Sequence, residues 1–306
     1  MIIHFDNVNP HSTSGPNSFA IRLAKSFFEL GHNVVFDKSN ADVSLIFIEP
    51  TTTKLASRVV QRLDGLWFKP SEFFHKNKAI HDCYQKSNAV IWQSEFDKTF
   101  VTKWWGQKPG TVINNGIRTE PVKKFTISAL EQIRNSYKLV FCCSANWHPQ
   151  KRLRDNVELF KHIRETIEPS SCLIVMGSNP DFIADKDIFY SGSQPHEVCL
   201  EVFSCANWMI HLAFLDHSPN VVVEALSQHT PVICSSEGGT KELVKDFGIV
   251  INETNPYDYG LLDYDNPPSI NVRQLQSLPD KDTLGTHANI DIMHVAQRYI
   301  ELFETL

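Results

Sequence analysis

The sequence predicts an α/β protein that contains two doubly wound parallel sheets. Short apolar runs, which are typical of buried strands, alternate with amphipathic helical segments along the chain. The alternation stops in the polar segment 118–138 and then starts again, which indicates two domains of similar design. In such sheets ligands bind beyond the carboxyl ends of the strands, so the polar turns after the predicted strands are the first candidates for a site.

Composition and charge narrow the functional classes. The chain has 306 residues, 42% of them hydrophobic, and a net charge of −6, which is typical of a soluble globular protein and argues against a general nucleic-acid binder. Its 7 cysteines form no CxxC pair, which argues against a zinc or dithiol site and fits a reducing compartment. The sequence shows no signal peptide and no apolar run of membrane-spanning length, so we expect a cytoplasmic protein.

The first domain is expected to start with an apolar strand and to alternate strands with helices. The run DVSLIFI at 42–48 is apolar almost throughout, which indicates a strand buried on both faces. Gly31 is expected to end the first helix and Ser94 to cap a later one. Strands are predicted at 1–5, 33–36, 42–48, 58–63, 89–93 and 111–114, and helices at 17–30, around Ala79, Cys83 and Tyr84, and at 95–105.

Four turns of this domain are placed on the predicted binding edge. The first holds a single glycine and lacks the G-x-G-x-x-G pattern on which a dinucleotide pyrophosphate rests, which argues against an NAD-dependent oxidoreductase. The four turns contain Gly15, Glu49-Pro50, Asp64-Gly65 and Asn115-Gly116.

The second domain repeats the pattern after the polar linker. Its first strand is followed by a cation-rich loop at 145–154, and the segment 255–282 is expected to form long surface loops. Residues 290–306 carry apolar side chains at helical spacing, which predicts a terminal helix that packs on an apolar partner. Strands are predicted at 139–144, 171–176, 188–190, 207–211, 231–234 and 248–251, and helices at 156–167 and 195–204.

The stretch 211–242 concentrates the candidate site residues. Ser218 is predicted to cap a helix whose first residue is Pro219. Asp216 lies in the turn before this helix, and Glu224 lies inside the helix, eight positions later. Because a helix N-terminus offers free N–H groups and the positive end of a dipole, the two acids are expected to bracket a phosphorylated ligand.

Several blocks of the sequence, in order, resemble the retaining glycosyltransferases of family 4, which have the GT-B fold. That family carries two glutamates with seven residues between them, and this chain keeps the spacing with Asp216 first and Glu224 second. The matching blocks are SGPNSFAIRLAKSFFELGHNV, SNAVIWQSEF, TVINNGI, SANWHPQKRL, IFYSGSQPHEVCLEVFSCANWMI and SPNVVVEALSQHTPVICSSEGGTKELV.

The resemblance implies two Rossmann-like, doubly wound parallel-sheet domains that face an interdomain cleft. Residues 1–120 would form the acceptor-side domain, and residues 138–287 the domain that binds the nucleotide-sugar donor. The terminal helix, at about 288–306, would pack back on the first domain.

The resemblance also implies roles for individual residues. Glu224 would bind the ribose hydroxyls, Asp216 would lie near the transferred sugar, and Lys151 would hold the diphosphate. Asn146 stands where the family usually has an arginine, and Arg152 or Arg154 is a candidate substitute. The residues expected to serve catalysis are Asp216, Lys151 and Asp64; those expected to bind the donor are Glu224, Ser218, Pro219, Asn220, Arg152, Asn146, Gly192 and Gly15.

The function implied is retaining transfer of a hexosyl group from a UDP-, GDP- or ADP-linked sugar to a hydroxyl of a glycan, lipid or small molecule. Lys151 and the amides at residues 218–220 would stabilise the leaving diphosphate, and a donor phosphate oxygen would take the proton of the acceptor. No cofactor beyond the co-substrate is expected, and no metal, since the sequence shows no metal-ligand cluster.

Other interpretations stay open. Taken alone, Glu224 is an ordinary helix carboxylate, Asp216 stabilises a turn and Lys151 belongs to a solvated basic patch. The departures at Asp216 and Asn146 also fit a nucleotide-sugar-binding partner subunit with impaired catalysis, and a GT-B sugar-nucleotide epimerase fits less well. The apolar stripe of helix 95–105, with Trp104 and Trp105, is expected either to pack on the sheet or to contact a membrane peripherally.

Overall fold

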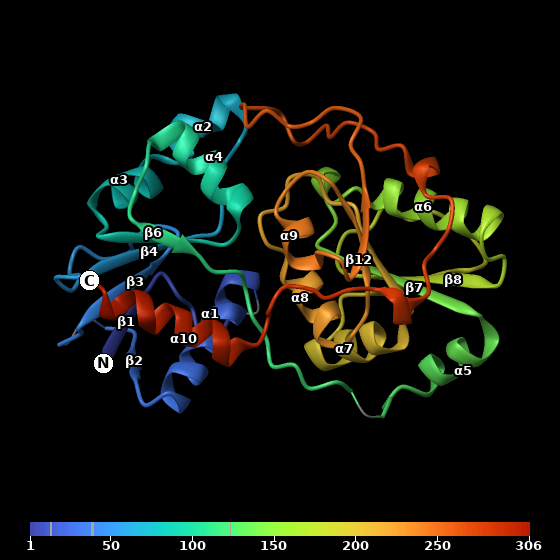
Figure 1. The fold of residues 1–306 in the computed structure, drawn as a ribbon, viewed down its shortest axis with the longest axis horizontal. Coiled ribbons are helices and arrows are strands. Elements are labelled where there is room, and N and C mark those ends of the chain that lie inside the picture. Colours follow the sequence, from blue (N-terminus) through green and yellow to red (C-terminus); the bar gives the residue numbers. More distant parts are fainter. Residues whose placement is uncertain (13, 38–39, 123) are drawn as a thin grey trace. The chain divides into compact units, whose positions relative to one another are not determined.

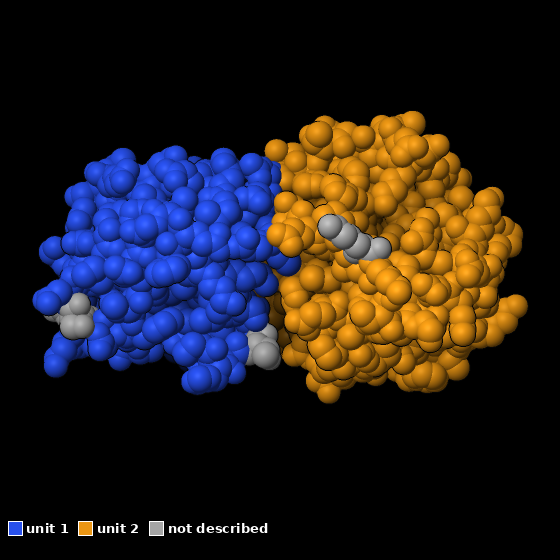
Figure 2. Space-filling view, turned by 90° about the horizontal axis from the view of Figure 1, so that it is seen from below, with its two compact units in different colours: residues 1–118, 258–263, 289–306 blue, residues 119–257, 264–288 orange. Residues whose placement is uncertain are grey.

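The computed structural model describes residues 1–12, 14–37, 40–122 and 124–306. The chain forms two compact units, which Figure 2 shows in blue and orange. Unit 1 contains Met1–Arg118, Asp258–Asp263 and Asn289–Leu306, and unit 2 contains Thr119–Tyr257 and Tyr264–Ala288. In these described ranges, every helix is too short or too polar to cross a bilayer. The predicted cleft between the domains stays a prediction.

Unit 1 is built on a six-stranded sheet in the order β2-β1-β3-β4-β5-β6. All neighbours pair in parallel, so every strand ends at the same edge. All five residues of β3 are buried, as the almost continuous apolar run predicts. The strands are β1 (Ile2–Asp6), β2 (Asn33–Val35), β3 (Val43–Phe47), β4 (Val59–Leu63), β5 (Ala89–Trp92) and β6 (Gly110–Val112).

The helices of unit 1 differ from the prediction in three places. Helix α1 already begins at Gly15, because Gly15 and Pro16 occupy the first turn, where a missing N–H costs nothing. Helix α2 was not predicted because its 7 residues are too few to show a period. In α3, Ile80 rather than Ala79 faces the core with Cys83 and Tyr84. The helices are α1 (Gly15–Glu29), α2 (Pro70–Lys76), α3 (Lys78–Lys86), α4 (Glu95–Trp105) and α10 (Ile292–Glu304).

Helix α4 is capped as predicted, because the Ser94 hydroxyl accepts the Asp97 amide at 3.1 Å. Its apolar stripe mostly packs inside unit 1. Phe96, Phe100 and Val101 are buried, and the Trp105 ring contacts Tyr84. Trp104 keeps part of its ring exposed, while its indole N–H donates to the Tyr259 carbonyl. The packing alternative therefore describes most of this stripe.

The C-terminal helix α10 belongs to the core of unit 1. In Figure 1 this red helix lies beside the blue α1, and its apolar face joins the same buried cluster as Phe19 and Phe27. Entry into the helix is fixed by Ile117, whose amide donates to the Ile290 carbonyl at 2.8 Å. A Cβ on Gly116 would lie 2.8 Å from a Val295 methyl carbon and 3.1 Å from the Ile290 carbonyl. Gly116 of the Asn-Gly pair thus allows the terminal helix to dock.

Unit 2 repeats the design with a second six-stranded parallel sheet in the order β12-β11-β10-β7-β8-β9. Its strands are β7 (Leu139–Ser144), β8 (Ser171–Met176), β9 (Ile188–Gly192), β10 (Trp208–His211), β11 (Val232–Ser235) and β12 (Gly248–Ile251). Its helices are α5 (Ser128–Ser136), α6 (Leu153–Thr166), α7 (His196–Cys205), α8 (Asn220–Ser227) and α9 (Thr240–Val244).

Three expectations for unit 2 need correction. The polar segment 118–138 contains helix α5 and is not linker throughout. Ser218 is not the N-cap of α8; Pro219 is, because its backbone is still extended at φ −71 and ψ 122, so the helix begins at Asn220. The segment 255–282 contains the short 3-10 turn Val272–Gln274, and a second one, Lys281–Thr283, begins at its end.

Candidate functional site

The candidate site of unit 2 lies at the carboxyl edge of its sheet. Strands β7 and β10 are neighbours, and the turns that follow them carry Lys151 and Asp216. The turn after β11 carries Gly238 and Gly239. Because all these strands run in parallel, residues far apart in the sequence meet at this edge.

Two donors converge on one carboxylate oxygen in this place. Lys151 Nζ lies 2.5 Å from Asp216 Oδ2, and His211 Nε2 lies 3.3 Å from the same atom. His211 is the last residue of β10, and its side chain is buried. The Asp216 side chain is 13% exposed. The three residues form a compact Lys–Asp–His group in which the aspartate is shared.

The charge state of this group follows from its surroundings. Burial raises the pKa of Asp216, but the Lys151 charge and the hydrogen bond from His211 outweigh it and hold that pKa well below its usual range. Burial is the main cause of the lowered pKa of His211. The imidazole is therefore neutral near pH 7 and must carry its proton on Nε2, because an ionised carboxylate can only accept.

The backbone around Asp216 is held by the turn after β11. The Asp216 carbonyl accepts the Gly239 amide at 2.7 Å, and Leu215 has a positive φ of 54°. Gly238 has φ +107, and a Cβ there would lie 2.8 Å from the Asp216 carbonyl oxygen. Gly238 is therefore needed because a second backbone approaches this closely.

Glu224 lies on α8 and has a partner that sequence reasoning missed. Its Oε1 lies 3.3 Å from Nε2 of His196, the first residue of α7. The Glu224 side chain is mostly buried, whereas His196 is exposed. Only the order of strands and helices brings the two together, so no local pattern signals the pair.

Arg152 is placed in the interior and not at the edge. Its guanidinium lies 2.5 and 3.1 Å from the two Glu253 oxygens, and the two side chains are 0% and 1% exposed. The same group donates to the Pro268 and Leu212 carbonyls. This arrangement argues against a direct contact of Arg152 with a diphosphate, so we leave it out of the proposed donor site.

The other candidates for the diphosphate loop differ in character. Asn146 is exposed, and its Oδ1 accepts the Ser178 hydroxyl at 2.6 Å. Arg154 is 77% exposed and lies 3.5 Å from Asp181. Lys151 is therefore the cation of this loop that the structure places against Asp216.

A cavity of about 500 Å³ borders this loop. His148 forms part of its wall, and the pKa of His148 is lowered by burial and then by the charge of Lys151. The cavity thus reaches the turn that carries Lys151. Its lining consists of Trp147, His148, Pro149, Arg152, Leu153, Arg154, Asp155, Asn179, Asp181, Asp265, Asn266 and Pro267.

The remaining donor-side candidates lie before α8, at the end of β9 and in unit 1. Ser218 and Pro219 are buried at the start of α8, where the Val222 amide bonds back to the Pro219 carbonyl at 3.1 Å. Gly192 ends β9 with φ +70. Gly15 begins α1 and belongs to unit 1. The contacts predicted for these residues and for Asn220 stay predictions.

In unit 1, Asp64 forms an ion pair with the buried Arg62. Arg62 also donates to Asn115 Oδ1 at 2.7 Å, and Asn115 donates to Gln93 Oε1 at 2.9 Å. The Arg62 guanidinium carbon lies 4.4 Å from the centre of the Phe19 ring. Asp64 thus balances an internal charge at the carboxyl edge of the sheet, and its predicted part in catalysis stays untested.

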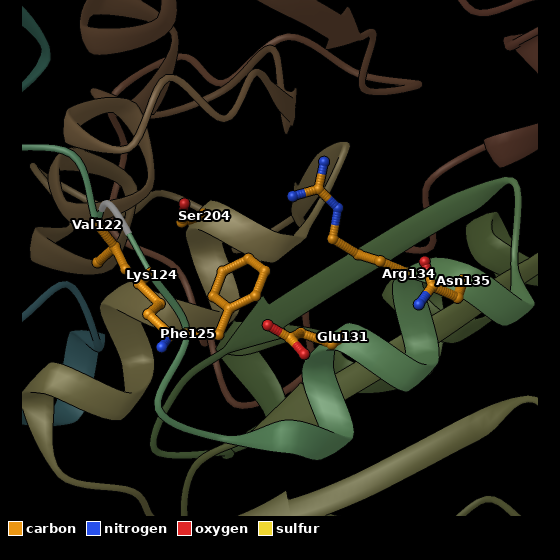
Figure 3. Close-up of a pocket in the computed structure, with 7 residues that line it drawn as sticks. All are labelled: Val122, Lys124, Phe125, Glu131, Arg134, Asn135 and Ser204. Carbon is orange, nitrogen blue, oxygen red and sulfur yellow. The ribbon is translucent and has the colours of Figure 1, made fainter.

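A second hollow, of about 630 Å³, lies away from these residues. It is formed by the start of unit 2, α5 and α7, as Figure 3 shows. Its lining is Val122, Lys124, Phe125, Glu131, Arg134, Asn135 and Ser204, and none of these was a predicted site residue. In the described part of the chain, no group of three or more His, Cys, Asp or Glu side chains could hold a metal ion.

Residues 128–259 match the family model described as glycosyl transferases group 1. The matched segment is less than half of the chain and includes Lys151, Asp216 and Glu224. A search of curated proteins found no match to the sequence.

Solved structures of similar fold cover the whole chain. HepE from Anabaena in complex with UDP-glucose matches with a TM-score of 0.66 at 15% identity, over 100% of both chains. Sucrose-phosphate synthase from Thermosynechococcus elongatus matches with a TM-score of 0.69 at 13% identity, over 100% of this chain and 98% of that one. WaaG, a glycosyltransferase of lipopolysaccharide biosynthesis, matches with a TM-score of 0.58 at 12% identity, over 100% and 96%. Together with the two parallel sheets, these likenesses confirm the predicted GT-B fold.

Proposed function

We propose that this protein is a glycosyltransferase that takes its sugar from a nucleoside diphosphate. The observation that carries the proposal is the pairing of Lys151 with Asp216 at the carboxyl edge of the unit 2 sheet. Asp216 in turn precedes Glu224 by eight positions. This pairing lies in the segment that matches the group 1 model. Lys151 and Asp216 at one sheet edge, with the carboxylate of Glu224 on the helix that follows, suit a ligand with a diphosphate and sugar hydroxyls.

In this proposal the residues of unit 2 have separate roles. Lys151 and the amides at the start of α8 stabilise the charge that develops on the leaving diphosphate. Glu224 accepts hydrogen bonds from the ribose hydroxyls. We assign retention of the anomeric configuration, with the acceptor hydroxyl attacking on the face of the leaving group and a donor phosphate oxygen taking its proton. This chemistry needs no metal, because Lys151 and the helix terminus supply the positive charge.

The donor and the acceptor are assigned on different grounds. HepE binds UDP-glucose and UDP, which makes the uridine nucleotides the first donors to test, before those of GDP and ADP. Unit 1 is assigned to the acceptor, with Asp64 at its sheet edge, while Gly15 at the start of α1 stays assigned to the donor. A hexosyl group is proposed for transfer to a glycan, a lipid or a small molecule.

We further propose a cytoplasmic protein with peripheral membrane contact through unit 1. Three exposed aromatic side chains of this unit, Trp67, Phe74 and Trp104, lie on or against α2, where Phe74 is 75% exposed and its ring contacts Phe73. Trp104 contacts Phe73 as well, and Lys76 lies over the Trp67 ring at 4.1 Å. Aromatic rings beside lysines suit a bilayer interface. Sedimentation with anionic vesicles that is the same for Phe74→Ser as for the wild type would contradict this assignment.

The test of the function starts with nucleotide binding. A thermal-shift screen with UDP, GDP, ADP and their sugars should raise the melting temperature for one base, since a ligand of the folded state stabilises it by mass action. Radiolabelled sugar should then be hydrolysed or transferred, and Asp216→Ala and Glu224→Ala should abolish this turnover. Binding without turnover across the donor panel would favour the impaired partner subunit, which the shorter Asp216 and the neutral Asn146 motivate. Epimerised donor without an acceptor would favour the epimerase.

A further inference from the structure

We propose that Asp216 acts on the diphosphate through Lys151, as a positioning residue backed by His211, and does not contact the transferred sugar. The inference rests on the proposed function and replaces the role that the resemblance implied for this residue. It assigns His211 a role as the second positioning residue.

The first argument is the direction of the carboxylate. Both donors bind Oδ2, Lys151 at 2.5 Å and His211 at 3.3 Å. His211 is part of β10 and is buried, so the hydrogen bond turns this oxygen toward the sheet. An aspartate is one methylene shorter than the glutamate usual at this position, and the shorter arm keeps the carboxylate close to the strand end. With 13% of the side chain exposed, Asp216 offers little surface to a sugar.

The second argument concerns Lys151. A lysine side chain has four rotatable bonds, and ordering it costs conformational entropy. The ion pair with Asp216 orders Lys151 before a ligand arrives, and the Lys151 side chain is still 22% exposed. A diphosphate that binds beside Lys151 therefore meets a cation already in place, which is the general advantage of preorganisation.

The third argument is the bracing of Asp216 itself. Its carbonyl is bound by the Gly239 amide, and its backbone pairs with Gly238 in a short parallel bridge. Its side chain is held from the other side by His211. A residue fixed through both its backbone and its side chain is suited to hold another group in place.

The decisive experiment compares a nucleotide with its sugar conjugate. Dissociation constants for UDP and UDP-glucose would be measured by calorimetry in the wild type, Asp216→Asn, Lys151→Ala and the double variant; GDP or ADP and their sugars replace them if the thermal-shift screen selects another base. Asp216→Asn should weaken the binding of both ligands by the same factor, about 5–20-fold. In the double variant it should cause no loss of affinity beyond that of Lys151→Ala alone. A loss confined to UDP-glucose, or one that persists without Lys151, would overturn the inference.

His211 is tested by matched replacements. His211→Phe keeps the ring but removes the donor and should weaken UDP and UDP-glucose equally, by about 3–10-fold, whereas His211→Gln, which keeps an N–H, should restore part of the affinity. Equal affinity in the wild type and in His211→Phe would contradict this role. Melting temperatures identify any variant whose loss comes from misfolding.

A ligand-free measurement separates the inference from the function. Modification of lysines by acetic anhydride, read by mass spectrometry, should be several-fold faster at Lys151 in Asp216→Asn than in the wild type, while the exposed Lys186 serves as the internal control. An unchanged Lys151 rate would overturn the inference even if nucleotides bind. Absence of any nucleotide binding by the wild type would overturn the proposed function and with it the assigned ligand.

Discussion

Arg152 and Glu253 form a fully buried ion pair, with Arg152 Nη1 2.5 Å from Glu253 Oε1. Arg152 holds a left-handed backbone at φ +52, and its guanidinium carbon lies 4.7 Å from the centre of the Phe214 ring. The pair ties the start of α6 to the segment after β12. An arginine that the sequence offers to a ligand is thus used to hold unit 2 together.

Breaking this pair should therefore destabilise the protein. Glu253→Ala leaves a buried charge without a partner and is expected to lower the free energy of unfolding by about 3–5 kcal/mol. Urea unfolding followed by circular dichroism measures the change. The matched control is Asp181→Ala at the exposed pair with Arg154, which should cost less than about 1 kcal/mol. Similar costs for both variants would contradict the structural role of Arg152.

Lys151 should carry much of the nucleotide affinity. Lys151→Ala removes a charged contact worth about 1.5–3 kcal/mol, so UDP should bind about 10–100-fold more weakly. Calorimetry with UDP gives the number. Arg154→Ala, in the same loop but highly exposed, is the control and should change the affinity less than about 2-fold. A larger effect at Arg154 than at Lys151 would mean that Arg154, and not Lys151, holds the diphosphate.

Glu224 should recognise ribose and not phosphate. Glu224→Gln is expected to weaken UDP by about 10-fold, since a charge-assisted bond to each hydroxyl becomes a neutral one. The same substitution should leave 2′,3′-dideoxy-UDP unaffected, because this nucleotide lacks both hydroxyls. Glu197→Gln, at an exposed acid of α7, is the control. An equal loss of affinity for UDP and 2′,3′-dideoxy-UDP would contradict the assignment of Glu224 to the ribose.

Gly238 should tolerate no side chain. Gly238→Ala would place a Cβ 2.8 Å from the Asp216 carbonyl at a strained φ of +107, and we expect a loss of at least about 2–3 kcal/mol together with weaker UDP binding. Gly106→Ala is the matched control, because its φ of +85 is also strained but no atom lies within 4 Å of the added Cβ. Thermal unfolding of both variants isolates the cost of the clash.

Stability should fall in acid through Asp185. Two Arg164 nitrogens lie 2.6 and 2.8 Å from its oxygens, and the hydrogen bond from Arg164 is the main cause that lowers the pKa of Asp185 to about 2. A folded-state pKa below the unfolded value of 3.8 means that this stabilisation is complete above pH 4 and is lost as the pH falls toward 2. Near the surface it amounts to about 1 kcal/mol. Asp185→Asn should lose it at pH 7 and unfold with a smaller dependence on pH between 4 and 2, as urea midpoints across this range would show.

The sequence by itself determined the class of the fold and the position of most strands. The apolar runs at β3, β7 and β8 are long and bounded by turn residues, so the requirement to bury them predicts a parallel sheet without any partner being known. The Ser94 cap was predictable because it is a local feature: its hydrogen bond spans only three residues. The spacing of Asp216 and Glu224 likewise pointed to a candidate site before any geometry was available.

Only the tertiary structure decided which side chains meet. Lys151 reaches the Asp216 oxygen that His211 also binds because β7 and β10 are neighbours in the sheet. Arg152 pairs with Glu253, which lies 101 positions away in the chain. The structure also showed that Gly116 lies close to Ile290 and Val295, so that a glycine there makes room for α10. Periodicity and capping report the local backbone, whereas the partner of a charged side chain depends on strand order and burial. The sequence therefore pointed to Lys151, Asp216 and Glu224 as candidates, whereas the partners of these side chains, His211 and His196 among them, came only from the tertiary structure. The roles of these residues in binding and catalysis stay predictions.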